Sequence, residues 1–383
     1  MPDQRRSGLA DELSRTEVSR PDCDGGEPTP PSLLVKYEHS RHFLPLLSQL
    51  GASLAVSTYQ AGKVVLIGCD RDQLKLSFHH FQRAMGLAVK PDCIAVGTRN
   101  LVWFLRNAPE IAPQLDPAGC HRGCFLARKS YVTGEIQSHE MAWVGDDLWV
   151  VNTLFSCLCT VHESFSFIPR WRPPFISALA AEDRCHLNGL ALVDGQPRYV
   201  TVMAESDTPG GWREKKESSG CLIDVPSGQT VARGFAMPHS PRVYGGRLWL
   251  LDSGCGLLVQ VDPATGKAEP VAEFPGYTRG LAFCGSLAFV GLSRIRETSV
   301  FSGIPIAAKR DELKCGVAVV DLPSGRVVAF LVFTSVVDEI FDVQVLPGMP
   351  WPALSGPFPD ADNAQTIWNV AEPSVLGASR SNR

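Results

Sequence analysis

Three side chains that can carry chemistry begin similar segments that lie far apart in the sequence. His139 begins the run HEMAWVGDDLWVVN and His239 begins the run HSPRVYGGRLWLLD. Arg279 begins a weaker copy, RGLAFCGSLAFVG. Imidazole groups move protons or bind metals near neutral pH, and guanidinium groups bind carboxylates and phosphates. What these residues can do together depends on whether the fold brings equivalent positions to one place.

The segments are copies of an internal repeat. Without a gap, the first two copies align Gly145 with Gly245 and Trp149 with Trp249. The copies begin at residues 85, 139, 188, 239 and 279, and are separated by 54, 49, 51 and 40 residues. Such a period, with short apolar runs and glycine-containing turns, is typical of a β-propeller blade. We therefore predict an all-β, six-bladed β-propeller.

The sixth blade is expected to be split between the chain ends. Residues 339–346 resemble an innermost strand with nothing after it. Residues 53–68 align with 247–262 and resemble the later strands of a blade. Strands from both ends would close the ring and remove two exposed edges.

The propeller is expected to span residues 31–350 and to include a short amphipathic helix within residues 33–50. Residues 1–30 are polar and proline-rich, so we predict a disordered tail. Residues 351–383 are expected to form an irregular C-terminal tail. The charged loop 205–219 could cover the channel.

Equivalent positions of the first strands should face one another around the central channel, because side chains alternate along a strand. This ring holds the six residues Met85, His139, Asn188, His239, Arg279 and Phe341. His186 lies two residues before Asn188 and should point the same way, one level nearer the entrance. We therefore predict His139, His239 and Arg279 as catalytic residues, with His186 and Asn188 binding the ligand.

A transition-metal site is one interpretation of the histidines. His139, His186 and His239 would be the ligands of a divalent transition metal such as zinc, iron, copper or nickel, and would leave positions open for substrate or water. Glu140 or Asp342 could join as a carboxylate ligand or base. Metal-free ligand binding, and simple hydrogen bonding to channel water and backbone, remain open alternatives.

Two further residues are candidate ligand-binding groups. Arg242, together with Arg279, suggests an anion site. By alternation Arg242 should face away from His239 unless the preceding proline introduces a bulge, and a pair with a carboxylate of a neighbouring blade is equally open. Asp252 is equivalent to Asn152 at the end of a second strand, where it would bind the ligand or tie adjacent blades.

Composition and absent motifs exclude several functions. With 36 Lys and Arg against 40 Asp and Glu, we expect neither nucleic acid nor a membrane as partner. The first thirty residues lack the apolar core of a signal peptide, so the twelve cysteines are expected to be reduced thiols of a cytoplasmic protein. The chain has no Gly-x-Ser-x-Gly elbow, phosphate loop or dinucleotide fingerprint.

Three long motifs resemble a bacterial family of conserved hypothetical proteins that is carried as a domain of unknown function. They are HSPRVYGGRLWLLDSG at 239–254, STYQAGK at 57–63 and HLNGLA at 186–191, and the resemblance covers roughly residues 33–350. It implies a fold and no established activity.

A more distant resemblance is to the gluconolactonase and senescence-marker-protein enzymes and to NHL-type repeats. The enzymes hold a divalent cation, usually calcium, with a Glu, two Asn and an Asp, and Asn188-Gly189 matches one such strand. His139, His239 and Arg279 are not the oxygen donors that calcium prefers, so neither the calcium site nor the lactonase activity follows.

Two functions therefore remain. In the first, the channel mouth binds, and transforms, a small polar or anionic metabolite, with a histidine as base or metal ligand and Arg279 orienting the anion. In the second, the propeller is a non-catalytic NHL-like scaffold for a protein partner. Three converging histidines favour the first, because a scaffold does not need them.

Overall fold

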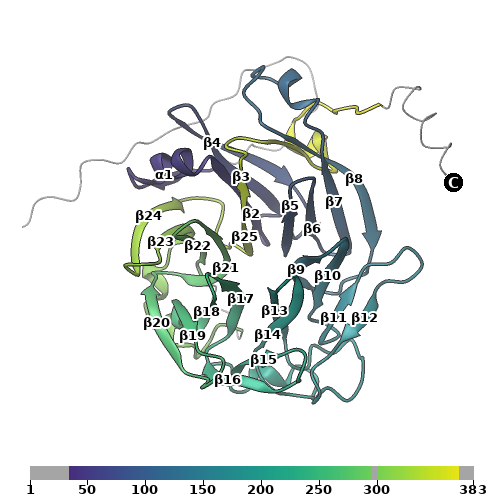
Figure 1. The fold of residues 1–383 in the computed structure, drawn as a ribbon, viewed down its shortest axis with the longest axis vertical. Coiled ribbons are helices and arrows are strands. Elements are labelled where there is room, and N and C mark those ends of the chain that lie inside the picture. Colours follow the sequence, from purple (N-terminus) through teal and green to yellow (C-terminus); the bar gives the residue numbers. More distant parts are fainter. Residues whose placement is uncertain (1–33, 296–299, 371–383) are drawn as a thin grey trace, which may run out of the picture.

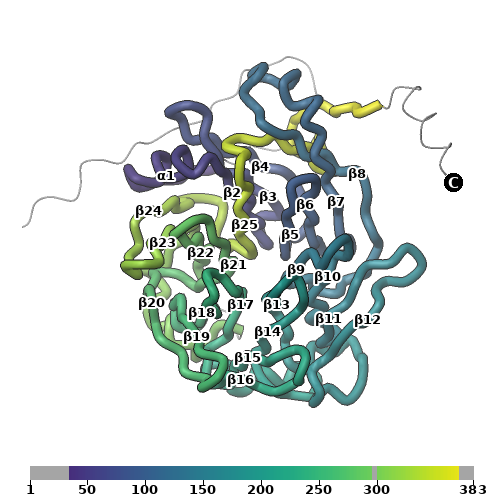
Figure 2. Tube along the Cα trace, viewed as in Figure 1, coloured from purple at the N-terminus to yellow at the C-terminus, as the bar shows by residue number. Residues whose placement is uncertain are grey.

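Six antiparallel sheets surround a central axis in the computed structural model, which describes residues 34–295 and 300–370 (Figure 1). Each sheet is one blade with its first strand beside the axis, and the chain passes around the ring from blade to blade (Figure 2). The predicted all-β, six-bladed β-propeller is thereby confirmed. The tail expected over residues 1–30 lies outside the described residues, as do residues 371–383.

The first three blades follow one another along the chain. Blade 1 contains β5 (Leu87–Lys90), β6 (Cys93–Gly97), β7 (Leu101–Asn107) and β8 (Cys124–Val132). Blade 2 contains β9 (Ser138–Val144), β10 (Asp147–Asn152), β11 (Cys157–Thr160) and β12 (Ile168–Trp171). Blade 3 contains β13 (Leu187–Val193), β14 (Gln196–Val202), β15 (Gly220–Asp224) and β16 (Thr230–Phe235).

Two further blades continue the series, and the last uses both ends of the propeller. Blade 4 contains β17 (Pro238–Tyr244), β18 (Arg247–Asp252), β19 (Leu257–Val261) and β20 (Ala268–Glu273). Blade 5 contains β21 (Tyr277–Cys284), β22 (Leu287–Ser293), β23 (Cys315–Asp321) and β24 (Arg326–Phe333). Blade 6 contains β25 (Asp342–Pro347), β2 (Ala52–Thr58), β3 (Lys63–Asp70) and β4 (Gln73–His80).

The split of blade 6 between the two chain ends is as predicted. β25 pairs with β2 in a continuous antiparallel register from Ala52 opposite Pro347 to Ser57 opposite Asp342. Residues from near the two ends of the chain therefore form the seam that closes the ring. Without this pairing, β2 would be the exposed edge strand of an incomplete blade 6.

Apolar side chains fill the spaces between adjacent blades. The middle strands are rich in β-branched residues and buried on both faces, as in Val64-Val65-Leu66-Ile67 of β3. Both faces are buried because each blade packs against two neighbours. Six clusters of buried apolar residues result, one at each interface between blades.

The segments outside the ring reinforce the two blades beside blade 6. β1 (Tyr37–His39) pairs with β24 of blade 5, and β26 (Ala353–Ser355) pairs in parallel with β8 of blade 1. The helix expected within 33–50 is α1 (Phe43–Leu50), which buries Phe43 and Leu47 between blades 5 and 6. No helix among the described residues is long and apolar enough to cross a membrane.

Neighbouring inner strands are joined by two alternating devices. At the position after the ring residue, three blades carry a side chain that accepts a hydrogen bond from a backbone N–H of the next blade: Asp342 (2.8 Å), Glu140 (3.1 Å) and Ser240 (3.1 Å). The other three blades carry glycine at this position: Gly86, Gly189 and Gly280. A Cβ at any of these glycines would lie under 3 Å from the following blade. Around the ring, interfaces between inner strands that are joined by a side-chain hydrogen bond therefore alternate with interfaces where a glycine allows close packing.

Candidate functional site

Four of the predicted site residues meet at one mouth of the channel. The ring centroid of His139 lies 4.8 Å from that of His186, 6.2 Å from that of His239 and 5.1 Å from that of Phe341. The guanidinium carbon of Arg279 lies 3.3 Å above the ring of Phe341. The inner strands of blades 2, 4, 5 and 6 and the start of blade 3 thus contribute to one cluster.

Backbone bulges in the inner strands set the directions of these side chains. The pairing register shifts between Val150 and Asn152 opposite β9, and between His239 and Arg242 in β17. The same irregularity occurs near the start of β13 and β21. A bulge re-aims side chains, so simple alternation fails beside the ring position.

Each of the three imidazoles is fixed through Nδ1. His239 Nδ1 lies 3.0 Å from the carbonyl oxygen of Met237, and His186 Nδ1 lies 2.9 Å from an Asp183 carboxylate oxygen. These oxygens only accept hydrogen bonds, so Nδ1 carries the proton in both rings. His139 Nδ1 lies 2.8 Å from the hydroxyl of Thr153. Nε2 of each ring has no hydrogen-bond partner among the described residues and is available as an acceptor.

Arg279 controls the electrostatics of the mouth. Burial, followed by the positive charge of Arg279, lowers the pKa of His139 and of His239 well below the usual range. Both imidazoles are therefore neutral at pH 7. Burial also lowers the pKa of Arg279, an effect that Glu339 opposes from 3.5 Å, and a guanidinium remains charged in proteins. Arg279 thus places its positive charge beside the two neutral imidazoles of His139 and His239.

The loop between β14 and β15 covers His186. The indole of Trp212 lies against the His186 ring, with 4.4 Å between centroids, and its N–H donates to Asp183 at 2.9 Å. Arg213 lies 3.5 Å from the same carboxylate. One buried carboxylate therefore orients both the imidazole and the covering loop. The expectation that residues 205–219 could cover the channel agrees with this arrangement.

Asn188 and Asp252 make local contacts. The carbonyl oxygen of the Asn188 side chain accepts a hydrogen bond from Thr201 at 2.6 Å, within blade 3. Its Nδ2 is buried and has no partner among the described residues. Asp252 accepts a hydrogen bond from the backbone N–H of Ala236 at 2.7 Å and so anchors the chain that enters β17. Burial raises the pKa of Asp252 to about 6.

Arg242 lies one layer below the histidines. It forms an ion pair with Glu140 of blade 2 and reaches the carbonyl oxygen of Leu190 in blade 3. The bulge anticipated at Pro241 is present, and so is a pair with a carboxylate from another blade. Burial raises the pKa of Glu140 to about 7 and also raises that of Asp342. Arg242 therefore holds together a buried ionic layer beneath the mouth.

Several mouth residues were not identified in the sequence. Tyr277 and Glu339 lie two residues before Arg279 and Phe341, so the spacing that selected His186 would also have selected them. Tyr277 contacts His239, with ring centroids 5.8 Å apart. Other mouth residues that were missed, namely Asp183, Trp212 and Tyr59, lie in connecting loops, where the repeat gives no signal.

The three histidines do not form a prearranged metal site. Within residues 34–295 and 300–370, no group of three or more His, Cys, Asp or Glu side chains has the geometry to hold a metal ion. Solvent still reaches the mouth, since the side chains of Arg279 and His186 are 12% and 13% exposed. A gap of about 10 Å³ beside Arg279 is lined by Tyr277, Ser293, Arg294, Phe301 and Glu339 and by none of the three histidines.

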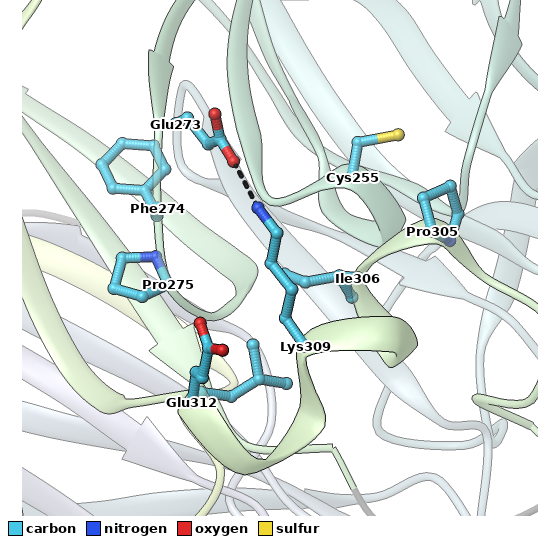
Figure 3. Close-up of a pocket in the computed structure, with 9 residues that line it drawn as sticks. Cys255, Glu273, Phe274, Pro275, Pro305, Ile306, Lys309 and Glu312 are labelled. Atoms are coloured by element: carbon cyan, nitrogen blue, oxygen red, sulfur yellow. Dashed lines mark hydrogen bonds and ion pairs between the residues drawn. The ribbon is translucent and has the colours of Figure 1, made fainter.

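A larger cavity lies outside the channel, between the end of blade 4 and the helical turn η4 (Pro305–Glu312) (Figure 3). Its volume is about 450 Å³. Its lining residues are Cys255, Glu273, Phe274, Pro275, Pro305, Ile306, Lys309, Glu312 and Leu313, and we call it the outer pocket. The turn η3 (Ser253–Cys255) separates the two sites: Ser253 Oγ lies 3.0 Å from His239 Nδ1, whereas Cys255 faces the outer pocket.

Comparisons with known proteins give one family model and several similar solved structures. A family model described as "Domain of unknown function (DUF4915)" matches residues 41–354. No curated protein matches the chain. A chain in the crystal structure of a nidogen/laminin complex is similar, with 10% identity and a TM-score of 0.46, and the match covers 78% of this chain and 99% of the other. A protein of unknown function from Bacteroides caccae is similar with 11% identity and a TM-score of 0.48, over 77% and 98% of the two chains.

Proposed function

Because the chain belongs to the DUF4915 family, a domain of unknown function whose model covers residues 41–354, we propose a function from its own residues: it binds a small hydroxycarboxylate at the channel mouth and accepts a proton from it. Arg279 is the anchor, His139 and His239 are hydrogen-bond acceptors, and His186 is the base. The observation that carries the proposal is a buried arginine among three imidazoles whose Nε2 atoms are available.

Arg279 supplies the charge that a carboxylate needs. A guanidinium can donate two parallel hydrogen bonds to a carboxylate, and the pair is strong where water is scarce. The present contact with Glu339 is long, at 3.5 Å. An incoming carboxylate would compete with Glu339 for the guanidinium edge, while the guanidinium face stays against Phe341.

The neutral imidazoles specify a donor group on the ligand. His139 and His239 are uncharged and engaged through Nδ1, so Nε2 of each can accept a hydrogen bond from a hydroxyl. Phe341 and Tyr59, whose ring centroids are 5.6 Å apart, would contact the carbon skeleton. These partners favour a carboxylate with a nearby hydroxyl over an inorganic anion.

His186 is the imidazole best placed to take a proton. Asp183 holds its Nδ1–H, and this leaves Nε2 as the basic nitrogen. A carboxylate in this position fixes the tautomer and stabilises the imidazolium that forms when Nε2 accepts a proton. The ligand would lose that proton from its hydroxyl or from the carbon beside its carboxylate.

A metal-centred function is the second candidate. Acceptors on Nδ1 are also found behind metal-bound histidines, and this favours it. The positive charge of Arg279 opposes a divalent cation at the same place. Near-stoichiometric metal in protein purified without an affinity tag, lost in a His139→Ala/His239→Ala variant, would replace our proposal with a metal centre.

Calorimetric titration with matched probes tests the proposal. Lactate should bind more tightly than propionate, which lacks the hydroxyl, and lactamide, which lacks the charge, should not bind. Arg279→Gln should weaken lactate binding by about thirtyfold or more, because truncating one partner of a buried charge pair typically costs 2–5 kcal/mol. Arg106→Gln, which removes an exposed arginine paired with Asp92 in blade 1, is the matched control.

Two results would refute the proposal. One is the absence of binding by any of the three probes at high millimolar concentration. The other is an equal loss of lactate binding in the Arg279 and Arg106 variants, which would indicate a general charge effect. In either case the non-catalytic scaffold for a protein partner would become the leading function.

A further inference from the structure

The outer pocket has the size and lining of a small-molecule site. Its volume of about 450 Å³ lies within the range of ligand pockets. Phe274, Ile306 and Leu313 are at most 5% exposed and form its apolar floor. Pro275 and Pro305 add apolar surface (Figure 3). An apolar body placed here would leave water on contact with these residues.

The charged groups of the pocket are at its opening. Lys309 reaches across from η4 to Glu273 at the end of β20, with 3.1 Å between nitrogen and oxygen (Figure 3). These two side chains are 61% and 65% exposed, so their ion pair contributes little and is easily exchanged. Glu312 is exposed and forms no ion pair within the described ranges. Two carboxylates and one ammonium give the pocket a net negative charge.

The one sulfur in the pocket adds no second anion. Burial, and then the nearby Asp252, raise the pKa of the Cys255 thiol to about 12. The thiol is therefore protonated at neutral pH and can act neither as a nucleophile nor as a charged partner. A ligand that matches this pocket therefore carries a positive charge on an apolar body.

We infer that the outer pocket binds a small amine whose ammonium group lies between Glu312 and Glu273 and whose apolar body packs on Phe274, Ile306 and Leu313. The inference is independent of the function proposed for the channel mouth, because η3 separates the sites and none of the pocket residues belongs to the mouth.

Three isosteric probes test the charge requirement. Phenethylamine, 2-phenylethanol and 3-phenylpropionate share an apolar body and differ in the polar end. Phenethylamine should bind the full-length protein at least about tenfold more tightly than either of the others, as expected for one hydrogen bond to a charged group. Equal affinity for the three probes, or no binding of phenethylamine at tens of millimolar, would overturn the inference.

A variant and a footprint fix the location. Glu312→Gln, an exposed substitution that leaves the floor intact, should weaken phenethylamine about tenfold, whereas Glu214→Gln, another exposed carboxylate, should leave it unchanged. Phenethylamine should also slow amide hydrogen exchange in η4, which forms one wall of the pocket, and leave the exchange of β9 unaffected. Amine binding that neither the Glu312 variant weakens nor hydrogen exchange in η4 detects would place the amine elsewhere and refute the site.

Discussion

The channel mouth and the outer pocket differ in almost every physical respect. Every imidazole at the mouth is held by a hydrogen bond. The outer pocket offers about 450 Å³ and holds its charges on exposed side chains. The outer pocket is therefore not the place where the three imidazoles converge.

The difference follows from what positions each site. Four side chains of the mouth come from inner strands, which the rest of the propeller keeps in place: His139, His239, Tyr277 and Arg279. One wall of the outer pocket is a helical turn in the long loop between β22 and β23. A strand-built site can hold groups in a fixed geometry, which proton transfer requires, whereas a loop-built pocket can accept a range of apolar bodies.

The largest expected effect is a difference in stability between a substitution near the mouth and one at the outer pocket. Arg242→Ala leaves Glu140 buried without its ion-pair partner and should lower the free energy of unfolding by about 3–5 kcal/mol. Lys309→Ala breaks an exposed pair and should cost less than about 1 kcal/mol. Urea denaturation of both variants measures the difference. Similar losses would mean that the buried ionic layer is not the stronger element.

A second substitution should weaken ligand binding at the mouth and leave binding at the outer pocket unchanged. Asp183→Asn removes the carboxylate that orients His186, Trp212 and Arg213. Lactate binding should weaken about tenfold, because His186 is no longer fixed in one tautomer. Phenethylamine binding should not change. Calorimetry with both probes tests this, and a parallel loss of both would indicate a general folding defect.

The third expected effect is a change in how the free energy of unfolding depends on pH. The pKa of His239 is far below the unfolded value of about 6.5, so the unfolded chain binds a proton below that pH and the folded chain does not. Its contribution to stability is complete above pH 6.5 and is lost as the pH falls, by up to about 1.4 kcal/mol per pH unit. His239→Gln should remove this part of the slope.

Two carboxylates change the stability in the opposite direction as the pH falls. The unsubstituted protein is therefore needed as a control. Glu140 and Asp252 have pKa values raised to about 7 and about 6, so the folded state gains stability from their protonation as the pH falls. The difference between parent and His239→Gln, measured by urea denaturation from pH 5 to 7.5, isolates the histidine. Parallel curves would contradict its assignment as a buried neutral group.

The smallest expected effect is at the opening of the outer pocket. Lys309→Met removes the ammonium that competes with an incoming amine for Glu273. Phenethylamine binding should tighten about twofold, since an exposed pair is worth only a few tenths of a kcal/mol. Lactate binding should stay the same. Weaker phenethylamine binding would mean that Lys309 contributes its aliphatic stem to the pocket instead of competing.

Sequence repeats predicted the fold and the convergence of His139, His239 and Arg279, because equivalent positions in a closed ring must face one another. The prediction was less complete where bulges interrupt alternation. Asn188 shares the ring position, yet its side chain bonds to Thr201, and Arg242 lies in the ionic layer. The parts of the site that the repeat did not predict are formed by contacts between loops.

Those loop contacts have no periodic signal. Asp183 and Trp212 come from two different connections and meet only after the blades are assembled. The three-residue strands β1 and β26 were equally undetectable, since their pairing with blades 5 and 1 depends on where the folded ring places its ends. The outer pocket likewise depends on η4, which lies outside the repeat.

The closure of blade 6 also determines how the molecule would respond to mechanical load. Ala52 and Pro347 lie opposite each other at one end of the β2–β25 pair, so tension applied there would open the seam one hydrogen-bonded pair at a time. Tension on the described chain would reach β1 on blade 5 from one side, and from the other side the contacts of Asp362 with Lys63 and His80 and then β26 on blade 1. The seam would therefore bear force only after these two short strands had detached.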